Sequence, residues 1–419
     1  MSHPLWPVAV RSIDVARPLE PLDGLAPYAA VRLFVSYGES LLGSVDIAND
    51  GADRVSVPRL RHSIAERLGH ALAREELTGR ADRHSLLAPT VVSIVVPTCN
   101  RPDDLRRCLR SLITQRTRHT TEIIVVDNRP ALGVARQIVR EFPSVRLISE
   151  ERPGLSYARN AGIVAATGTI VVATDDDVTA PSGWLERLVA PFVRADVMCV
   201  AGNVLPMELE TEAQWLFEEY GGLGKGFTPI EADGHWFRSR RDAVPTWRLG
   251  ATANAAFRAS VFRDPRIGLL DEALGAGMPT GCSEDTYLFY KILAAGGTML
   301  YEPTAYVWHR HRTTMAALRQ QIRAYSRGHV AYHLLTLTRH HDVRTLIRFF
   351  YSLPKTYARR ALDRLRGWSQ YPLSLILLEI QGNLEGAWAL WQARRRVKRL
   401  RERSRGVPVE SSVTESSAT

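Results

Sequence analysis

The clearest pattern in the chain is an alternation of apolar runs and amphipathic stretches from residue 91 to 177. Four runs rich in β-branched residues predict strands buried on both faces of a sheet: VVSIVV at 91–96, EIIVVDN at 122–128, VRLIS at 145–149 and TIVVATDDD at 169–177. Helices are predicted between them, at about 102–114, at 131–141 and within 152–166. This alternation predicts an α/β fold with a mostly parallel sheet that has helices on both faces.

The first 90 residues have a different pattern. Residues 31–37 alternate apolar and polar positions, as a half-buried strand does, and a second strand is expected around 41–47. Apolar residues then recur every four positions from Leu60 to Leu72, which predicts a helix. We therefore expect a small N-terminal α+β module, a β-hairpin with a helix, over residues 1–90, with a polar linker at 78–90.

Helical patterning dominates from residue 313 to about 405, and the net charge changes how this part is interpreted. The formal net charge is +10, but residues 394–405 hold eight Arg or Lys and one Glu, so the remainder is close to neutral. A nucleic-acid-binding core is therefore not predicted, and no nucleic-acid partner is expected. The helical, basic extension at 331–405 suits either helices packed on the main domain or a peripheral contact with a membrane surface. The Ser/Thr-rich end, 406–419, is predicted to be disordered.

Composition and cysteine usage set the expected compartment. Hydrophobic residues make up 45% and charged residues 23% of the chain, as in ordinary globular proteins. The four cysteines form no CxxC pair, which favours a reducing cytoplasm over a zinc site or a disulfide framework. The start, MSHPLWPVAV, does not resemble a signal peptide, and no run of 18 uncharged apolar residues occurs. We expect a cytoplasmic protein, with any membrane contact at the inner face of the cell membrane.

Polar residues gather where the predicted strands end. Asp175, Asp176 and Asp177 follow the strand run VVAT directly, and Pro97–Arg101 and Asp127–Asn128 end two other strands. Ligands bind at this edge of parallel sheets, so the three clusters are expected to converge. Three adjacent carboxylates are costly to bury without a cation, and oxygen ligands suit Mg²⁺ or Mn²⁺ better than zinc. Taken alone, the three aspartates also fit an acidic loop or a helix N-cap.

An ordered set of motifs resembles the family 2 glycosyltransferases, which are inverting enzymes with the GT-A fold. The motifs are IVVPTCNRPDDL (94–105), IIVVDN (123–128), RPGLSYARNAGI (152–163), VVATDDDV (171–178), GATANAAFR (250–258), EDTYLFYKILAAGG (284–297) and VWHRHR (307–312). The resemblance implies a Rossmann-like GT-A domain, which we place at 91–330. It also implies a nucleotide-diphosphate sugar as donor and a divalent metal, Mn²⁺ or Mg²⁺, as cofactor.

The resemblance also implies roles for individual residues. Residues expected to bind the nucleotide or the donor sugar are Pro97, Thr98, Asn100, Arg101, Asp127, Arg159, Asp175, Asp176 and Asn254. Asp127 would accept a hydrogen bond from the base, Arg159 would hold the nucleotide or its phosphates, and Asn254 would lie near the sugar or the acceptor. The expected metal ligands are Asp177, Asp175 and His309. His309 is favoured over His311 for the last of these positions.

The acidic pair Glu284 and Asp285 matches the catalytic pair of the family, in which the aspartate is the general base. Inversion requires a carboxylate that takes the proton of the acceptor hydroxyl while that oxygen attacks the anomeric carbon. A helix start favoured by the helix dipole would also explain an acidic pair at this position, and both explanations are compatible.

The predicted function is therefore transfer of a sugar to an acceptor hydroxyl, with a glycan or a lipid-linked glycan as the expected acceptor. Two alternatives remain at this stage. A nucleotidyltransferase also uses a Rossmann-like sheet, a nucleotide and acidic metal ligands, although it has no need of the acidic pair at 284–285. A non-catalytic nucleotide-sugar-binding or glycan-binding protein is disfavoured by the complete set of acidic residues.

Overall fold

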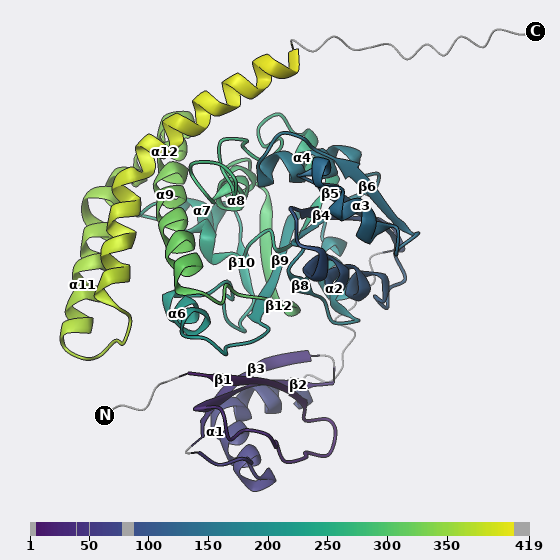
Figure 1. Cartoon of the computed structure of the whole chain (residues 1–419), viewed down its shortest axis with the longest axis vertical. Coiled ribbons are helices and arrows are strands. Elements are labelled where there is room, and N and C mark those ends of the chain that lie inside the picture. The colour runs from purple at the N-terminus through teal and green to yellow at the C-terminus, as the bar shows by residue number, and fades with distance from the viewer. Residues whose placement is uncertain (1–5, 39, 50, 78–87, 406–419) are drawn as a thin grey trace, which may run out of the picture.

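The computed structural model describes residues 6–38, 40–49, 51–77 and 88–405 of the 419-residue chain. It has a central sheet flanked by helices, a smaller sheet below it near the N-terminus, and a group of helices along one side near the C-terminus (Figure 1). Most of the expected linker (78–90) and the whole expected disordered end (406–419) lie outside the described residues.

The central sheet has nine strands in the order β10-β12-β9-β11-β7-β4-β5-β6, with β8 paired to β12. The strands are β4 (Val91–Thr98), β5 (Thr120–Asp127), β6 (Val145–Ser149), β7 (Ile170–Thr174), β8 (Val178–Thr179), β9 (Val197–Pro206), β10 (Ile230–Ala232), β11 (Asn254–Arg258) and β12 (Thr298–His309). Strands β7, β4, β5 and β6 are parallel neighbours, and they are the four strands predicted from the sequence. In the other half of the sheet, β11 runs antiparallel to both β7 and β9, whereas β9 and β12 are parallel.

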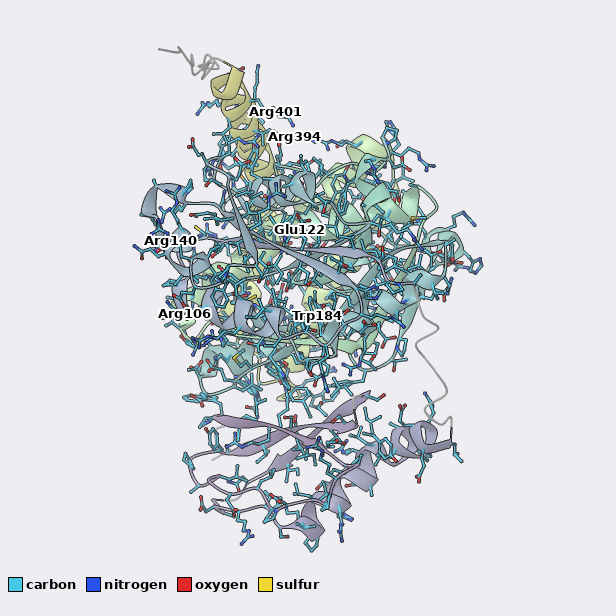
Figure 2. All side chains as sticks on the ribbon, turned by 90° about the vertical axis from the view of Figure 1, so that its right-hand side faces the viewer. Arg106, Glu122, Arg140, Trp184, Arg394 and Arg401 are labelled. Carbon is cyan, nitrogen blue, oxygen red and sulfur yellow. The ribbon has the colours of Figure 1, made fainter. Side chains whose placement is uncertain are left out.

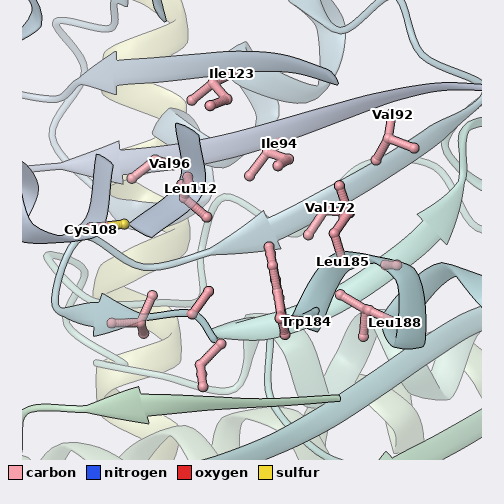
Figure 3. Close-up of a cluster of buried hydrophobic side chains, with 14 of the residues drawn as sticks. Val92, Ile94, Val96, Cys108, Leu112, Ile123, Val172, Trp184, Leu185 and Leu188 are labelled. Atoms are coloured by element: carbon pink, nitrogen blue, oxygen red, sulfur yellow. The ribbon is translucent and has the colours of Figure 1, made fainter. Parts of the chain in front are cut away.

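Helices cover both faces of this sheet, because neighbouring residues of each strand point to opposite sides and are apolar on both. The helices of this part are α2 (Pro102–Ile113), α3 (Val134–Val139), α4 (Leu155–Ala165), α5 (Trp184–Val189), α6 (Glu212–Tyr220), α7 (Gly234–Arg238) and α8 (Glu284–Ala294), with short 3-10 turns η1 (Pro130–Leu132), η2 (Ala190–Val193), η3 (Thr246–Arg248) and η4 (Ala259–Arg263). Ile94 and Val96 pack with α2, α3 and α5 on one face, around Trp184 (Figure 3). Val95 packs with α4 and α8 on the other face. The predicted α/β fold with helices on both faces is confirmed.

The N-terminal part forms a separate three-stranded sheet, made of β1 (Val8–Asp14), β2 (Ala30–Tyr37) and β3 (Ser40–Ala48), with α1 (Val57–Leu77) against it. Strands β2 and β3 and the helix were predicted, whereas β1, which pairs in parallel with β2, was not. This sheet lies against the central part, where the rings of Phe34 and Trp308 pack in a T-shaped arrangement with their centroids 5.1 Å apart. The boundary of this module at residue 90 stays a prediction.

The C-terminal part is helical, as predicted. It contains α9 (Met315–His340), α10 (Arg344–Ile347), the π-helical turn η5 (Arg348–Ser352), α11 (Leu353–Leu365) and α12 (Leu373–Arg405). Helix α12 approaches α9 closely at Gly382, where an added Cβ would lie 2.7 Å from the Cβ of Ser326. Within the part of the chain that the structure describes, no helix has the length and apolar character needed to cross a membrane.

Candidate active site

A cleft of about 1200 Å³ opens where strands β4, β5 and β7 end. Its walls include Pro97, Thr98, Arg101, Arg159, Asp175, Asp176, Asp177, Glu284, Asp285 and His309, all of which were predicted site residues. These residues come from segments as far apart as β4 and the end of β12, so the topology of the sheet brings them together. The expected convergence of the strand-end clusters at one edge is therefore seen in the structure.

Asp176 is tied to the loop that follows β4. Its Oδ2 accepts a hydrogen bond of 2.7 Å from Thr98 Oγ1, and its Oδ1 lies 3.3 Å from an Nη1 of Arg101. Burial and the neighbouring Asp177 raise the pKa of Asp176, while Arg101 opposes this increase. Because both of its oxygens are engaged within the protein, Asp176 joins β4 to the end of β7.

Asp177 has one carboxylate oxygen engaged and one free of hydrogen bonds. Its Oδ2 accepts a hydrogen bond from Arg101 Nη1, whereas its buried Oδ1 has no hydrogen-bond partner and lies 3.4 Å from His309 Nε2. Burial works against ionisation of this carboxyl, but His309, Arg101 and Arg312 outweigh it and hold the pKa below its usual value. A buried, ionised oxygen without a hydrogen-bond donor is costly, so it calls for a cation.

His309 is oriented by a chain of hydrogen bonds behind it. Its Nδ1 lies 2.9 Å from Nδ1 of His311, and Nε2 of His311 lies 3.0 Å from Oε1 of Glu218 on α6. If Glu218 is ionised, His311 donates from Nε2 and accepts at Nδ1, so His309 donates from Nδ1. In the neutral form of His309, Nε2 then has a lone pair on the side of Asp177, whereas in the protonated form Nε2 pairs with that carboxylate. Burial lowers the pKa of His309, although Asp177 opposes this effect, and the lowered pKa favours the neutral form that binds metals.

The pair Asp177 and His309 fits a divalent metal that receives its other ligands from a substrate. Among the described residues, no group of three or more His, Cys, Asp or Glu side chains is arranged to hold a metal. The structure thus does not unite Asp175, Asp177 and His309 as one ligand set. Mg²⁺ and similar ions usually keep several waters and bind through one or two protein ligands together with substrate phosphates. The orphaned Oδ1 of Asp177 and the lone pair of His309 suit this mode of binding.

Arg159 joins Asp175 to Glu284 instead of facing an open phosphate site. Its guanidinium is buried and donates to Asp175 Oδ1 and to Glu284 Oε1, at 2.6 Å in both cases. Burial and the adjacent Asp285 raise the pKa of Glu284, and Arg159 opposes this increase. The direct contacts of Arg159 therefore connect the end of β7 to the start of α8, and they differ from the phosphate contact expected from the sequence.

Asp285 is the member of the acidic pair that stays accessible. Ser283, at a positive φ of 75°, precedes α8 and turns the chain so that Glu284 points inward and is buried. Asp285 is only partly buried and lines the cleft. Its Oδ1 accepts hydrogen bonds from the Thr286 backbone N–H at 2.6 Å and from Thr286 Oγ1 at 3.1 Å, and its Oδ2 lies 3.4 Å from the Thr252 N. These donors fix the direction of the carboxylate.

Three predicted donor-binding residues do not line the cleft. Asn254 is fully buried, where it accepts from Trp184 Nε1 and donates to the carbonyl oxygens of Asn203 and Ala305. These hydrogen bonds join Asn254 to α5 and to the neighbouring strands, so its predicted place near the sugar stays a prediction. Asp127 is also buried and accepts from the backbone N–H of Arg129 at 2.9 Å, and Asn100 adopts a positive φ of 58° in the loop after β4. The residue next to Asp127, Asn128, lines the cleft in its place.

Lys225 and Glu218 belong to the site but were not predicted. Lys225 lines the cleft within the glycine-rich segment GGLGKG, and that segment was the one available signal. Burial lowers the pKa of Lys225, while the charges of Asp285 and Glu218 oppose this effect. Glu218 has no motif of its own, because its role depends on the distance between α6 and the end of β12.

Comparisons with known proteins show similarity to glycosyltransferases. Residues 93–264 match the model of the family described as glycosyl transferase family 2. A pre-mycofactocin glycosyltransferase of Mycobacterium tuberculosis is 30% identical over 231 residues, which cover 54% of this chain and 43% of that protein. A glucosyl-dolichyl phosphate glucuronosyltransferase of Haloferax volcanii is 30% identical over 176 residues, covering 41% of this chain and 53% of that one.

The matched segments span only about half of each of these two relatives. Among solved structures, a mannosyltransferase of Pyrobaculum calidifontis in complex with GDP-Man and Mn²⁺ is 17% identical, with a TM-score of 0.41 over 75% of this chain and 76% of that one. The family match covers β4, β5 and β7, whose ends carry the three strand-end clusters. Residues 93–264 of this chain are thus similar to glycosyl transferase family 2.

Proposed function

We propose that the protein is an inverting, metal-dependent glycosyltransferase that moves a sugar from a nucleotide-diphosphate sugar to an acceptor hydroxyl. The observation that carries this proposal is the division of the cleft between two acidic groups. Asp177 and His309 form a site for a cation at the ends of β7 and β12, whereas Asp285 presents a partly exposed carboxylate from the start of α8. A transfer with inversion needs these two functions in separate places.

The chemistry follows from this division. When bound at Asp177 and His309, a divalent metal would neutralise the charge that develops on the leaving nucleotide diphosphate. Asp285 would accept the proton of the acceptor hydroxyl as a bond forms between the acceptor oxygen and the anomeric carbon. The bond from that carbon to the diphosphate oxygen breaks in the same step, on the opposite face of the sugar. The hydrogen bonds from Thr286 would hold the Asp285 carboxylate toward the acceptor.

The walls near β4 and β5 are the proposed nucleotide end of the cleft. Pro97, Thr98, Arg101 and Asn128 lie there, and Arg101 also contacts Asp177, so it sits between the proposed nucleotide and metal positions. We place Asp127 and Asn100 behind this wall, where they shape the loops that follow β4 and β5.

We propose a glycan or a lipid-linked glycan as acceptor, with a peripheral membrane contact through the C-terminal helices at the inner face of the cell membrane. The far walls of the cleft support this, because they come from these helices and include Tyr357, Arg360, Glu379 and Asn383. The name of the Haloferax volcanii relative refers to a lipid-linked sugar.

The function can be tested with the purified chain and a panel of UDP-, GDP- and dTDP-sugars, with and without Mn²⁺. We expect one nucleotide class to raise the melting temperature in the presence of metal, and slow release of nucleoside diphosphate to follow. Asp285→Asn should keep this binding and lose about 10²- to 10⁴-fold in turnover, as expected for loss of a general base. Asp103→Asn, the same substitution at an exposed position outside the cleft, is the control.

Each outcome bears on a different part of the proposal. If no nucleotide sugar changes the melting temperature, with or without metal, the proposal as a whole is wrong. If binding occurs but no acceptor is ever glycosylated and no diphosphate is released, the protein is a binding protein instead. If Asp285→Asn keeps nearly full turnover, another group is the base.

A further inference from the structure

The helices at 343–365 expose an apolar surface that no other part of the described chain covers. Of the 19 large hydrophobic residues that are exposed among the described residues, 13 lie between 343 and 391. Those of the first helices are Val343, Leu346, Ile347, Phe350, Tyr351, Leu362 and Leu365, and the spacing of three, four and seven positions from Val343 to Phe350 is typical of one helix face. Phe350 is 81% and Leu365 is 73% exposed, and no residue of α11 is buried.

Helix α12 has a similar exposed stripe on the side away from the body. Gly382 and Gly386 face α9, where an added Cβ would collide with Ser326 and Val330. Leu377, Leu384, Trp388 and Trp391 are exposed instead, with Leu384 at 80%. These four residues, Trp368 and the seven exposed residues between Val343 and Leu365 named above are called the C-terminal face. Large exposed apolar patches that are rimmed by polar residues mark sites of contact with proteins or membranes.

The charge around the C-terminal face indicates the kind of partner. Residues 343–405 hold fifteen Arg or Lys against four Asp or Glu, a net charge of +11, whereas the whole chain has +10. All of the net positive charge therefore lies on these helices. Arg366 stacks on Trp368 with 5.1 Å from its Cζ to the ring centroid, and Arg395 stacks on Trp391 at 3.7 Å. Arg394 and Arg401 lie on the C-terminal half of α12 (Figure 2), where Arg401 also pairs with Glu272 at 3.0 Å.

We propose that the C-terminal face docks on the surface of an anionic lipid bilayer. Apolar and tryptophan side chains surrounded by arginine are typical of helices that lie in the bilayer interface, and none of the described helices is suited to cross it. A second copy of the chain is a poorer occupant, because a symmetric dimer would bring two surfaces of the same strong positive charge together.

Docking would also orient the cleft. Tyr357, Arg360, Glu379 and Asn383 belong to the same two helices and line the far end of the cleft. The cleft would then open beside the bilayer, within reach of an acceptor held by a lipid. The docking deepens the membrane contact of the proposed function, and only this second step rests on the proposed sugar transfer.

Sedimentation of the full chain with lipid vesicles tests the docking. We expect binding to vesicles of phosphatidylcholine with phosphatidylglycerol, and weak binding to phosphatidylcholine alone. Phe350→Ser, Leu365→Ser and Trp368→Ser combined should weaken binding at least about tenfold, because these side chains would enter the interface. The matched control is Leu132→Ser with Val164→Ser, which removes exposed apolar residues of the central part. Replacing Arg359 and Arg364 with Gln should cost on the order of fivefold per charge at low salt.

Three results would overturn the docking proposal. They are failure of the wild-type chain to bind the anionic vesicles, undiminished binding by the triple serine variant, and a wild-type dimer in gel filtration that the triple variant abolishes. The last result would assign the face to a second copy. Release of diphosphate from a nucleotide sugar in lipid-free solution should be the same for the wild type and the triple variant, so this test is independent of the proposed chemistry.

A separate observation links the N-terminal module to the proposed metal site. Arg32 on β2 donates from Nη1 to Oε2 of Glu218 at 3.1 Å, and from Nε and Nη2 to the two oxygens of Asp46 at 2.8 Å each. The other oxygen of Glu218 accepts from His311, which in turn contacts His309. A continuous series of polar contacts therefore runs from Arg32 through Glu218, His311 and His309 to Asp177.

We infer that Arg32 is a positioning residue for His309. Arg32 and Asp46 hold Glu218 in place, and Glu218 as acceptor fixes the tautomer of His311 and then that of His309. The lone pair on His309 Nε2 thus depends on a side chain from another part of the chain. Partners behind a metal-binding histidine commonly control metal affinity in this way. This inference rests on the proposed metal site, and it gives the N-terminal module a function in the cleft.

Binding of Mn²⁺ can be measured by electron paramagnetic resonance in the presence of UDP or GDP, without turnover. We expect Glu218→Gln to weaken Mn²⁺ binding about tenfold and Arg32→Ala by a smaller factor, with Arg32→Lys in between. Arg17→Ala, which removes an exposed arginine of the same module, should leave the affinity unchanged. A lowered melting temperature of Arg32→Ala with unchanged Mn²⁺ affinity would overturn the inference and leave the proposed function intact. Absence of Mn²⁺ binding by the wild type with either nucleotide would overturn both.

Discussion

Replacing Arg159 by Leu should lower the stability of the protein markedly. The guanidinium of Arg159 is buried between Asp175 and Glu284, and each carboxylate lies 2.6 Å from one of its nitrogens. Leucine fills part of the same volume but leaves two acidic groups without their cation. Breaking a buried ion pair by removal of one partner costs about 3–5 kcal/mol. We expect a loss of this size in the free energy of unfolding.

The loss should grow as the pH rises. Burial, with a contribution from Asp285, raises the pKa of Glu284 in the folded protein above its value in the unfolded chain. The stability linked to this group is therefore fully present below the unfolded pKa and is lost as the pH rises through the folded pKa. Without Arg159, which opposes the increase, the folded pKa rises further. The deficit of Arg159→Leu relative to wild type is thus expected to be larger at about pH 8 than at about pH 5.5.

Urea unfolding of both proteins at the two pH values, followed by circular dichroism, measures this effect. Arg266→Leu is the control, because Arg266 pairs with Asp264 at the surface and should contribute at most about 1 kcal/mol. Arg159→Leu combined with Glu284→Gln should recover part of the stability and have a smaller pH dependence. The reasoning is refuted if Arg159→Leu is no less stable than Arg266→Leu, or if its deficit shrinks at higher pH.

Two further predictions concern the interior of the sheet beside the cleft. Asn254→Ala leaves Trp184 Nε1 and two carbonyl oxygens without their hydrogen-bond partner. It should lower the free energy of unfolding in urea by about 2–4 kcal/mol, while the KM for the donor stays unchanged. A raised KM at equal stability would instead place Asn254 in the donor site. Gly202→Ala would place a Cβ 1.9 Å from the Ala305 oxygen, so we expect the free energy of unfolding to fall by about 1–3 kcal/mol or more in the same measurement. Gly133→Ala is the control, because Gly133 has open space around it and a left-handed φ. It should show only the smaller cost of an alanine in that backbone conformation.

The strands that the sequence predicts well are those buried on both faces. Residues 91–96 and 122–128 became β4 and β5 almost unchanged, because a continuous β-branched run has few alternatives in an α/β protein. Strands β9, β11 and β12 were not assigned to the sheet. The apolar pattern of β9 and β11 is interrupted by Gly202 and Asn254, which contact each other in the sheet. The position of β11 between β7 and β9 depends on pairing between residues far apart in the sequence. The sequence also did not predict what the exposed face of α11 contacts, because the same amphipathic pattern suits packing on protein and contact with lipid.

The three aspartates show where prediction of the site reaches its limit. Strand alternation predicts that Asp175 and Asp177 point the same way, but β7 ends at Thr174 and the chain then turns. Asp175 consequently meets Arg159, Asp176 meets Thr98 and Arg101, and Asp177 meets Arg101 and His309.

Three neighbouring carboxylates at a strand end are tolerated because each has its own partners, and these partners come from β4, α4 and β12. The sequence contains all of these residues, but their pairing depends on how those elements pack. Of the six carboxylate oxygens, the Oδ1 of Asp177 is buried without a hydrogen bond in the described structure, and it is also the one that faces the lone pair of a histidine. The cation that the three aspartates require is therefore largely provided by arginine, and the single remaining oxygen is what makes this edge of the sheet suitable for a metal.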